Sequence, residues 1–409
     1  MTTIYKEDLT AQAKSKFKEL GYPHQKMEDW RFTNINQIKN TKYSKCSFDY
    51  VKDLSEVEYP TFKDTHQIII VNGSLQKDFK YEIQNIEIEN LFSILNDAPE
   101  KIDNYFAKIA NYETHAFLAK NTQEFVDGLF IKIPKNIVVE KPIHIINLTK
   151  SKYSKTVTYP RFFIYIEEGS QVEIIEHFIS DNDNTLTNTC TEILAEENSN
   201  IKYSCIQDEG DTNNHFSYLG IQQHSHSNVT CQTYSLSGKF IRNDVMVNLN
   251  GIGSEINLNG IFTVEESNFV DNHTRINHNV EHCISKELYK GVLRNNAHGV
   301  FSGMINVEPH AHHTDSFMEN RNLLLSESSQ MNSNPQLVIN CDEVRCSHGS
   351  TTGQIDEDAL FYLRSRGLSI TDAHLLLISG FINEVIDNIT FEDLKLFLNK
   401  IIESWIIKP

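Results

Sequence analysis

A serine that returns at a nearly constant interval is the feature that most restricts how this chain can fold. It stands at positions 170, 199, 227 and 254, each time after a turn and before alternating apolar residues. One coil of such a repeat cannot bury its apolar face alone, so successive coils must stack. The repeat predicts a mainly β protein with a β-solenoid core over residues 126–350. The alternative is a large β-sandwich, whose turns come about every 8 to 12 residues without a longer period.

The residues before the repeat predict a separate unit of mixed structure. A chain of 409 residues exceeds the size at which one hydrophobic core keeps growing, so several units are expected. Apolar residues at helical spacing lead up to Leu20, and Gly21 follows as a stop signal. Residues 68–71 predict a strand, and the spacing over residues 102–110 predicts another helix. Residues 1–125 are therefore expected to form an N-terminal helical and mixed domain.

The residues after the repeat predict a C-terminal helical domain over residues 351–409. Asp356 is a candidate N-cap for a first helix that ends near Gly367. A second helix is expected over residues 371–387 and a third from Thr390 onward. The third carries a wide apolar stripe, which must be covered either by the solenoid or by another protein.

One segment near the N-terminus carries two aromatic residues in a polar setting. Trp30 and Phe32 lie within residues 28–33, among charged and polar neighbours. Large aromatic side chains are typical both of packing anchors and of partner contacts. Both interpretations stay open, and the packing anchor is favoured.

Charge and cysteine usage restrict the location and the partners. The chain has 55 acidic and 37 basic residues, a formal charge of −18, which disfavours nucleic-acid binding. No apolar run is long enough to cross a bilayer, and no signal peptide stands at the start, so a cytoplasmic protein that does not enter a membrane is expected. Seven cysteines without a CxxC pair fit reduced thiols in the cytosol.

Cys346 and His348 form the most specific candidate metal-binding pair. In an extended segment side chains two positions apart share a face, so these two would project together while Cys341 would point away. A thiolate and an imidazole are too few for a closed structural zinc site, which takes four ligands. The alternative is a buried cysteine and a hydrogen-bonded histidine beside a turn.

Other motifs predict no further chemistry. Histidines cluster at positions 310, 312 and 313 and at positions 273, 278 and 282, but without the helical spacing of a known metal site. Stacked coils could still bring such histidines together. No phosphate-binding loop and no nucleophile triad are present, so no ATPase activity is expected of this chain.

Four stretches of this sequence resemble the SufB/SufD family of the SUF iron-sulfur cluster assembly scaffold. They are Cys346-Ser347-His348-Gly349, residues 361–367, residues 301–304 and residues 28–33, so the resemblance spans nearly the whole chain. The Cys-Ser-His-Gly run is similar to the SufD side of the family, because SufB has a Glu-containing segment there. Ser350 stands where the family commonly has alanine.

The resemblance implies a right-handed parallel β-helix flanked by N-terminal and C-terminal helical domains. It also implies a non-enzymatic scaffold that pairs with a SufB-like sister subunit, or with itself when alone, and whose C-terminal domain docks a SufC-like ABC ATPase. A transient iron-sulfur cluster would form at the interface with the sister subunit, with no permanently bound cofactor. His348, helped by Cys346, would be a cluster ligand, and a reduced flavin could bind the whole complex.

Two other classes of function stay open at this point. A β-solenoid can bind protein or carbohydrate with no metal role, in which case His348 is merely buried. It can also form an enzyme of the pectin-lyase kind, which would need acidic residues along one face at the repeat spacing, and no such pattern is visible.

Overall fold

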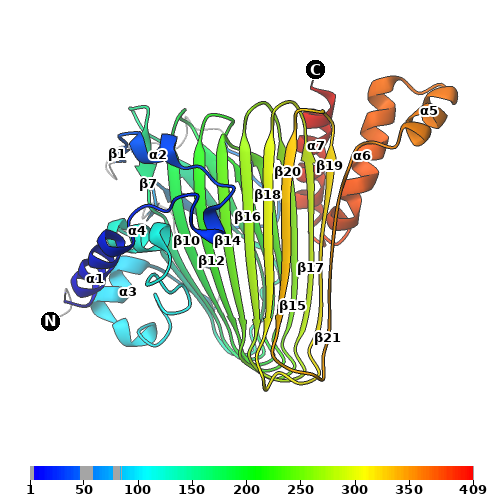
Figure 1. Ribbon diagram of the computed structural model, residues 1–409. Helices are drawn as coiled ribbons and strands as arrows, with labels where there is room; N and C mark the ends of the chain where they lie inside the picture. The colour runs from blue at the N-terminus through cyan, green and yellow to red at the C-terminus, as the bar shows by residue number, and fades with distance from the viewer. Residues whose placement is uncertain (1–3, 47–58, 77–82, 84, 409) are drawn as a thin grey trace.

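The computed structural model describes residues 4–46, 59–76, 83 and 85–408, and two long sheets dominate this part of the chain (Figure 1). The order of the first sheet is β20-β18-β16-β14-β12-β10-β8-β5-β4, with β1 and β7 beside it. The order of the second is β21-β19-β17-β15-β13-β11-β9-β6-β2-β3. From β8 to β21 successive strands alternate between the two sheets and pair in parallel with the strand two places away. This pattern confirms the predicted β-solenoid and excludes the sandwich, whose sheets are antiparallel.

The first sheet consists of these strands: β1 (Ser44–Lys45), β4 (Glu87–Asn90), β5 (Leu129–Ile133), β7 (Thr156–Thr158), β8 (Arg161–Ile166), β10 (Leu186–Ala195), β12 (Asn214–Gln223), β14 (Phe240–Leu249), β16 (Phe269–His278), β18 (His298–Val307) and β20 (Gln330–Ile339). The second consists of β2 (His66–Val71), β3 (Ser74–Leu75), β6 (Ile143–Thr149), β9 (Gln171–Ser180), β11 (Asn200–Asp208), β13 (Asn228–Ser237), β15 (Glu255–Val264), β17 (Ile284–Leu293), β19 (Asp315–Leu324) and β21 (Arg345–Gly353).

The repeated serine closes the turn before four strands of the second sheet, β9, β11, β13 and β15. Its side chain is buried in all four copies, and the hydroxyls of Ser199 and Ser227 donate to the carbonyls three residues earlier, at 2.7 and 2.6 Å. The residue before it takes a positive φ, as at Gly169 and His226. A short hydroxyl that satisfies the turn carbonyl explains why the position recurs. Cys283 and Thr314 occupy the same place in the next two coils.

Polar side chains lie within the solenoid as well as apolar ones. Register aligns Leu258, Glu287, Met318 and His348 in one column of the second sheet. The first three are almost completely buried, so this column faces the interior. Burial raises the pKa of the Glu287 carboxyl to about 8, against a smaller opposing effect of the Thr274 hydroxyl. Glu287 is therefore mostly protonated at neutral pH.

Helices cover the start of the solenoid, and the first of them, α1, is the predicted helix that ends at Leu20. They are α1 (Ile4–Leu20), α2 (Asn36–Asn40), α3 (Leu91–Asp97) and α4 (Ala116–Glu124), with short 3₁₀ turns η1 (Glu28–Trp30) and η3 (Pro99–Lys101). The helix predicted for residues 102–110 is wrong, because this segment forms successive turns. Ala107 has a positive φ, and the Ala107 and Ala110 N–H groups donate to the buried Glu192 carboxylate. An uninterrupted helix would have bonded these donors to its own carbonyls.

The segment of residues 28–33, called the N-terminal segment below, packs on the outer face of the first sheet. Trp30 acts there as a packing anchor, which is the interpretation that the sequence favours. Its indole is buried, and the Arg242 guanidinium lies over it at 3.8 Å from the ring centroid. Arg242 also donates to the Asp29 carbonyl at 2.8 Å and pairs with Asp271 at 2.6 Å. Phe32 is only partly buried.

The C-terminal helices are α5 (Glu357–Ser365), α6 (Ile370–Ile386) and α7 (Glu392–Ile407). Asp356 caps α5 through hydrogen bonds from the Asp358 and Ala359 N–H groups, as predicted. The apolar faces of α6 and α7 are covered by the chain itself, since Ile382 and Leu398 share a core cluster with the outer face of the second sheet. An ion pair between Lys290 of the second sheet and Glu384 of α6, at 2.6 Å, fixes α6 on this face. None of the helices in the described ranges is long and apolar enough to cross a membrane.

The domain boundaries proposed after residues 125 and 350 stay a prediction. Strands β2 and β4 come from the first segment but pair with β6 and β5 of the solenoid. Strand β21 runs on to Gly353.

Replacing Glu287 by glutamine should make stability less dependent on pH. A carboxyl whose pKa is raised by folding keeps its proton longer in the folded state, so it contributes stability that is lost as pH rises from its unfolded value towards about 8. Glutamine mimics the protonated form. As pH rises from 5 to 8, the free energy of unfolding of wild type should fall by up to about 1.4 kcal/mol per pH unit relative to that of Glu287→Gln. Urea-unfolding midpoints of both proteins, measured over this pH range, report the difference. The same pH dependence of the midpoint in both proteins would contradict the buried, protonated state.

Candidate functional site

The last coil of the solenoid is uncovered in the described part of the chain. Strands β20 and β21 end their sheets and pair on one side only, with β18 and β19. No residue of either strand is buried, whereas every residue of β10 is. An unpaired strand edge offers a row of backbone donors and acceptors to another chain. The solenoid therefore has an open end.

Cys346 and His348 both lie on β21 at this open end. In the register, Cys346 is opposite Ser316 and His348 is opposite Met318. Ser316 and Met318 are buried in the interior, so the side chains in register above them lie on the interior face of the coil. The structure thus places the two predicted site residues on one face, in the opening.

The two side chains have different surroundings. Cys346 is half-buried against the main core cluster, and burial raises its thiol pKa, with smaller contributions from Asp315 and Cys341. His348 is exposed and makes no hydrogen bond or ion pair with the described residues. The alternative of a buried, hydrogen-bonded histidine does not fit this arrangement.

A short chain of hydrogen bonds runs through the interior below Cys346. The Ser316 and Ser285 hydroxyls are 2.8 Å apart, and Ser285 lies 2.9 Å from His278 Nε2. Burial lowers the pKa of His278 to about 4, so its imidazole is neutral at pH 7. Sequence reasoning missed both serines, because only the strand register brings them beneath Cys346.

The prediction for Cys341 rested on a wrong assumption about the backbone. That prediction assumes one extended segment through residue 348, in which Cys341 points to the opposite face. Strand β21 begins only at Arg345, and Cys341 lies in the preceding turn. Its thiol is buried in the same core cluster that Cys346 packs against, with Sγ 3.4 Å from His312 Nδ1. Alternation along a strand does not apply across a turn.

The other histidines gather only in part. The His282 and His313 rings, one from each sequence cluster, stack with centroids 4.8 Å apart, as the stacking of coils allows. His273 instead pairs with Asp271 at 3.0 Å, and His278 lies inside the solenoid. Among the residues that the structure describes, no group of three His, Cys, Asp or Glu side chains is arranged to hold a metal ion.

The open end therefore offers an incomplete ligand set. A thiol and an imidazole suit iron and iron-sulfur centres. Two protein ligands on an open face cannot enclose a metal, so further ligands would have to come from another chain or from the cargo itself. Such a site can accept and release a metal centre more readily than a closed one.

Two family models match this chain. One is described as SUF system FeS cluster assembly, SufBD core domain, and matches residues 147–381. The other is described as SufBD protein N-terminal region and matches residues 6–145. Together they confirm the resemblance that the motifs indicated.

Curated relatives agree over most of the chain. Iron-sulfur cluster assembly protein SufD of Escherichia coli is 26% identical over 378 residues, which cover 92% of this chain and 87% of that protein. An iron-sulfur cluster assembly SufBD family protein of Synechocystis is 27% identical over 397 residues, covering 92% and 86%. Protein ABCI7, chloroplastic, of Arabidopsis thaliana is 26% identical over 381 residues, covering 90% and 79%.

Thiol alkylation should report the open end. Cys346 is half-buried, whereas Cys190, Cys205 and Cys231 are buried and should react with iodoacetamide only after unfolding. The raised pKa of Cys346 leaves less thiolate at pH 7 than a free cysteine has, so its alkylation should be slower than that of glutathione and should keep rising beyond pH 9.

Peptide mass spectrometry after timed labelling measures these rates, and Cys346→Ser identifies the modified site. A rate that levels off below pH 8 would contradict the raised pKa. Equal labelling of Cys346 and Cys231 in the folded protein would contradict the open end.

Proposed function

This chain belongs to the SufBD family of SUF iron-sulfur cluster assembly proteins, and from that premise we propose that it is a non-catalytic scaffold subunit. Its role lies in iron-sulfur cluster assembly. In our proposal the open end of the solenoid pairs with a SufB-like sister subunit, and a nascent cluster forms between the two. The observation that carries the proposal is the exposed His348 beside Cys346 on the interior face of an uncovered coil.

The unpaired strands support pairing at this end. A sister solenoid could extend both sheets by bonding to the free edges of β20 and β21. The same edges would accept a second copy of this chain when the sister subunit is absent. Covering them would also bury apolar side chains that are now exposed, such as Val338 and Ile339.

The cluster is cargo in this proposal, so the site must hold it weakly. His348 would bind iron through a neutral imidazole nitrogen, and Cys346 would assist as a thiolate. The sister subunit would supply the remaining ligands, and no cofactor would stay bound. A reduced flavin on the whole complex stays a prediction. The proposed location is the cytoplasm, which the seven free cysteines support.

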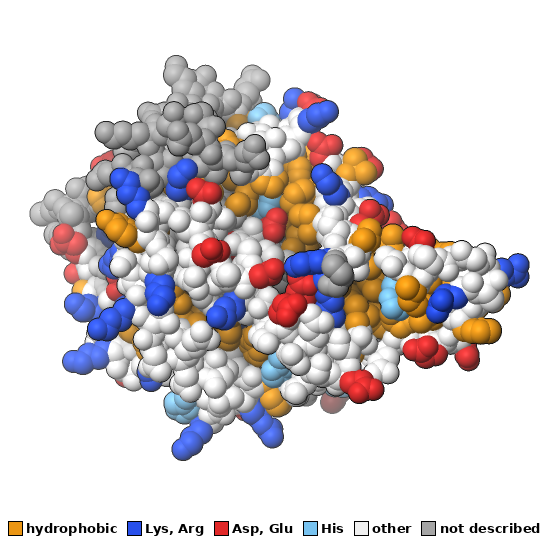
Figure 2. Space-filling model, turned by 90° about the horizontal axis from the view of Figure 1, so that it is seen from above, with side chains coloured by type: hydrophobic (Ala, Val, Ile, Leu, Met, Phe, Trp, Pro, Cys, Tyr) orange, Lys and Arg blue, Asp and Glu red, His pale blue; other side chains and the backbone are white. Residues whose placement is uncertain are grey.

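We also propose that a SufC-like ABC ATPase docks on α5. This helix projects from the body of the molecule, and hydrophobic side chains gather on the projecting lobe (Figures 1 and 2). Phe361 and Tyr362 of α5 are 75% and 56% exposed. Exposed aromatic residues on a projecting element are typical of protein contacts. The helices α6 and α7 instead serve to cover the second sheet, so deleting the whole tail would uncover its core.

Replacing His348 by alanine should lower cluster content without disrupting assembly. The side chain is exposed, so its loss leaves no cavity or unpaired charge, but it removes one iron ligand. We expect at least a several-fold loss of iron and sulfide from the complex purified with its sister subunit and ATPase. Cys346→Ser should have a milder effect.

His310→Ala is the matched control, because His310 is also exposed but lies in the turn that precedes β19. Co-purification of the sister subunit should be the same in all variants. Equal iron and sulfide in His348→Ala and wild type would reject the ligand role.

A double substitution on α5 tests the ATPase contact. Phe361→Ser combined with Tyr362→Ser removes the exposed aromatic area and leaves α6 and α7 in place, so the chain should fold normally. The apparent affinity of the double variant for the ATPase subunit, followed by co-elution, should be at least tenfold lower than that of wild type. Leu396→Ser on α7, at a side chain that is 58% exposed, is the control. Unchanged co-elution of the double variant would exclude α5 as the docking site.

A further inference from the structure

Two histidines are sealed beneath α7 on the outer face of the second sheet, away from the open end. His144 of β6 and His177 of β9 are both fully buried. Their rings are nearly parallel, with centroids 5.8 Å apart. His177 shares its strand face with Ile175, which packs in the core cluster beneath α7. The proposed cluster assembly gives these histidines no role.

Aromatic rings enclose the two imidazoles. Phe62 stacks on His144 with centroids 4.5 Å apart, and Phe397 of α7 packs edge-on against His177 at 5.3 Å. Phe62 in turn lies 5.4 Å from Phe397 and 5.9 Å from Phe391. We call this cluster of rings the histidine cage. Phe62 and α7 therefore separate both imidazoles from water.

Neither imidazole has a polar partner inside the histidine cage. All ring nitrogens of His144 and His177 are buried without a hydrogen bond in the described part of the chain. Burial lowers the pKa of His144 to about 3. Burial also lowers the pKa of His177, with a smaller contribution from His144. Both imidazoles are therefore neutral in the closed cage, where a charge would be far more costly.

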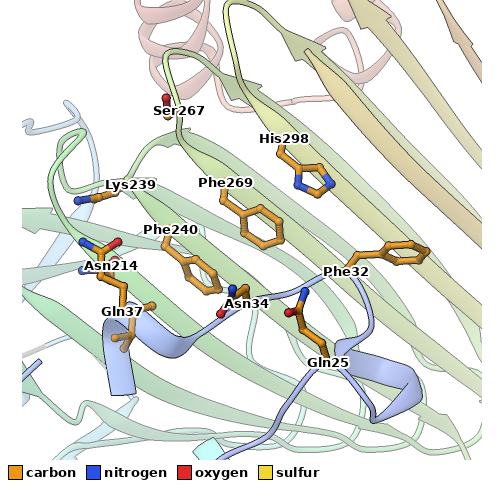
Figure 3. Close-up of a pocket in the computed structure, with 11 residues that line it drawn as sticks. Gln25, Phe32, Asn34, Gln37, Asn214, Lys239, Phe240, Ser267, Phe269 and His298 are labelled. Carbon is orange, nitrogen blue, oxygen red and sulfur yellow. The ribbon is translucent and has the colours of Figure 1, made fainter. Parts of the chain in front are cut away.

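A histidine beside aromatic rings on the other sheet has different surroundings. His298 packs edge-on against Phe269, with centroids 5.1 Å apart (Figure 3). It is only partly buried, and its Nε2 lies 2.7 Å from Asn332 Oδ1. Water can therefore reach His298 without the movement of a helix, whereas it cannot reach His144 or His177.

Charged groups around the histidine cage do not offset its burial. The titratable side chains on the surrounding elements are Lys63, Asp64, His66, Lys141, Glu173, Lys202, Glu392, Asp393, Lys395, Lys400 and Glu403. None of these forms an ion pair or a hydrogen bond with either imidazole in the described ranges. Glu176, next to His177 in the chain, faces the interior and accepts from Thr191 and Tyr203. Protonation inside the closed cage would leave a buried charge without a counter-ion.

We propose that the histidine cage is a pH-sensitive latch that holds α7 on the second sheet. At neutral pH both imidazoles are uncharged and the cage stays closed. In mild acid each imidazole takes up a proton from water only when Phe62 or α7 moves away. Protonation then stabilises the open arrangement, and α7 leaves the sheet. This latch depends neither on cluster assembly nor on ATPase docking.

Opening of the latch should become much more favourable as pH falls. A histidine whose pKa is lowered in the closed state contributes stability that is present above about pH 6.5 and lost below it. With an ordinary pKa of about 6.5 in the open state, each imidazole should raise the opening constant about 25-fold from pH 7 to pH 5. Both imidazoles together should raise it about 600-fold.

Hydrogen–deuterium exchange of the full chain tests the latch. Protection factors of the α7 amides, corrected for the intrinsic exchange rate at each pH, should fall about 600-fold from pH 7 to pH 5. Those of β10 should fall far less. His144→Gln and His177→Gln do not titrate, so each should reduce the fall to about 25-fold and the double variant should abolish it. His144→Leu combined with His177→Leu is a second non-titrating pair, which leaves no buried amide.

His298→Gln is the matched control, because His298 also packs beside aromatic rings but lies on the other sheet. It should keep the full fall of wild type. Equal protection of α7 at pH 7 and pH 5 in wild type would overturn the latch. So would a fall that persists in both non-titrating double variants. A fall of the same size in α7 and β10 would indicate global unfolding and would also overturn it.

Discussion

The register between parallel strands is the constraint on which the rest of this structure depends. Each strand pairs with the equivalent strand of the next coil, so residues at equivalent positions form columns. The turn column of buried Ser254, Cys283 and Thr314 shows that such a position needs a small side chain with a hydrogen-bonding atom. The environment of a residue is therefore set by its column and by how many coils cover it.

The same constraint decides which surfaces need cover. The outer face of the second sheet is covered by α6 and α7. The ion pair between Lys290 and Glu384 joins α6 to this face. Part of the first sheet is covered by the N-terminal segment, where Trp30 packs under Arg242. The end of the stack has no such cover in the described residues, because every coil is covered only by the next one. The open end is a direct consequence of building by repetition.

The sequence predicts most of the fold and less of the site. The serine period was sufficient for the solenoid, because each coil repeats the same local turn. Helical spacing failed over residues 102–110, where backbone N–H groups bond to Glu192, a residue far away in the sequence. Alternation placed Cys346 and His348 on one face, but no local pattern reveals that this face is uncovered. The placement of Ser316 below Cys346 follows only from the register.

Comparison of His278 with His348 shows how a histidine at the end of the stack differs from one within it. Both imidazoles face the interior, but His278 lies beneath further coils, where burial lowers its pKa to about 4 and keeps it neutral. His348 has the same orientation without the cover. In the proposed complex a sister solenoid would supply that cover and bury His348 in the same way. The sister subunit would then bring the other ligands at the moment when it covers His348. Opening the interface would then return His348 to water and weaken its hold on the cargo.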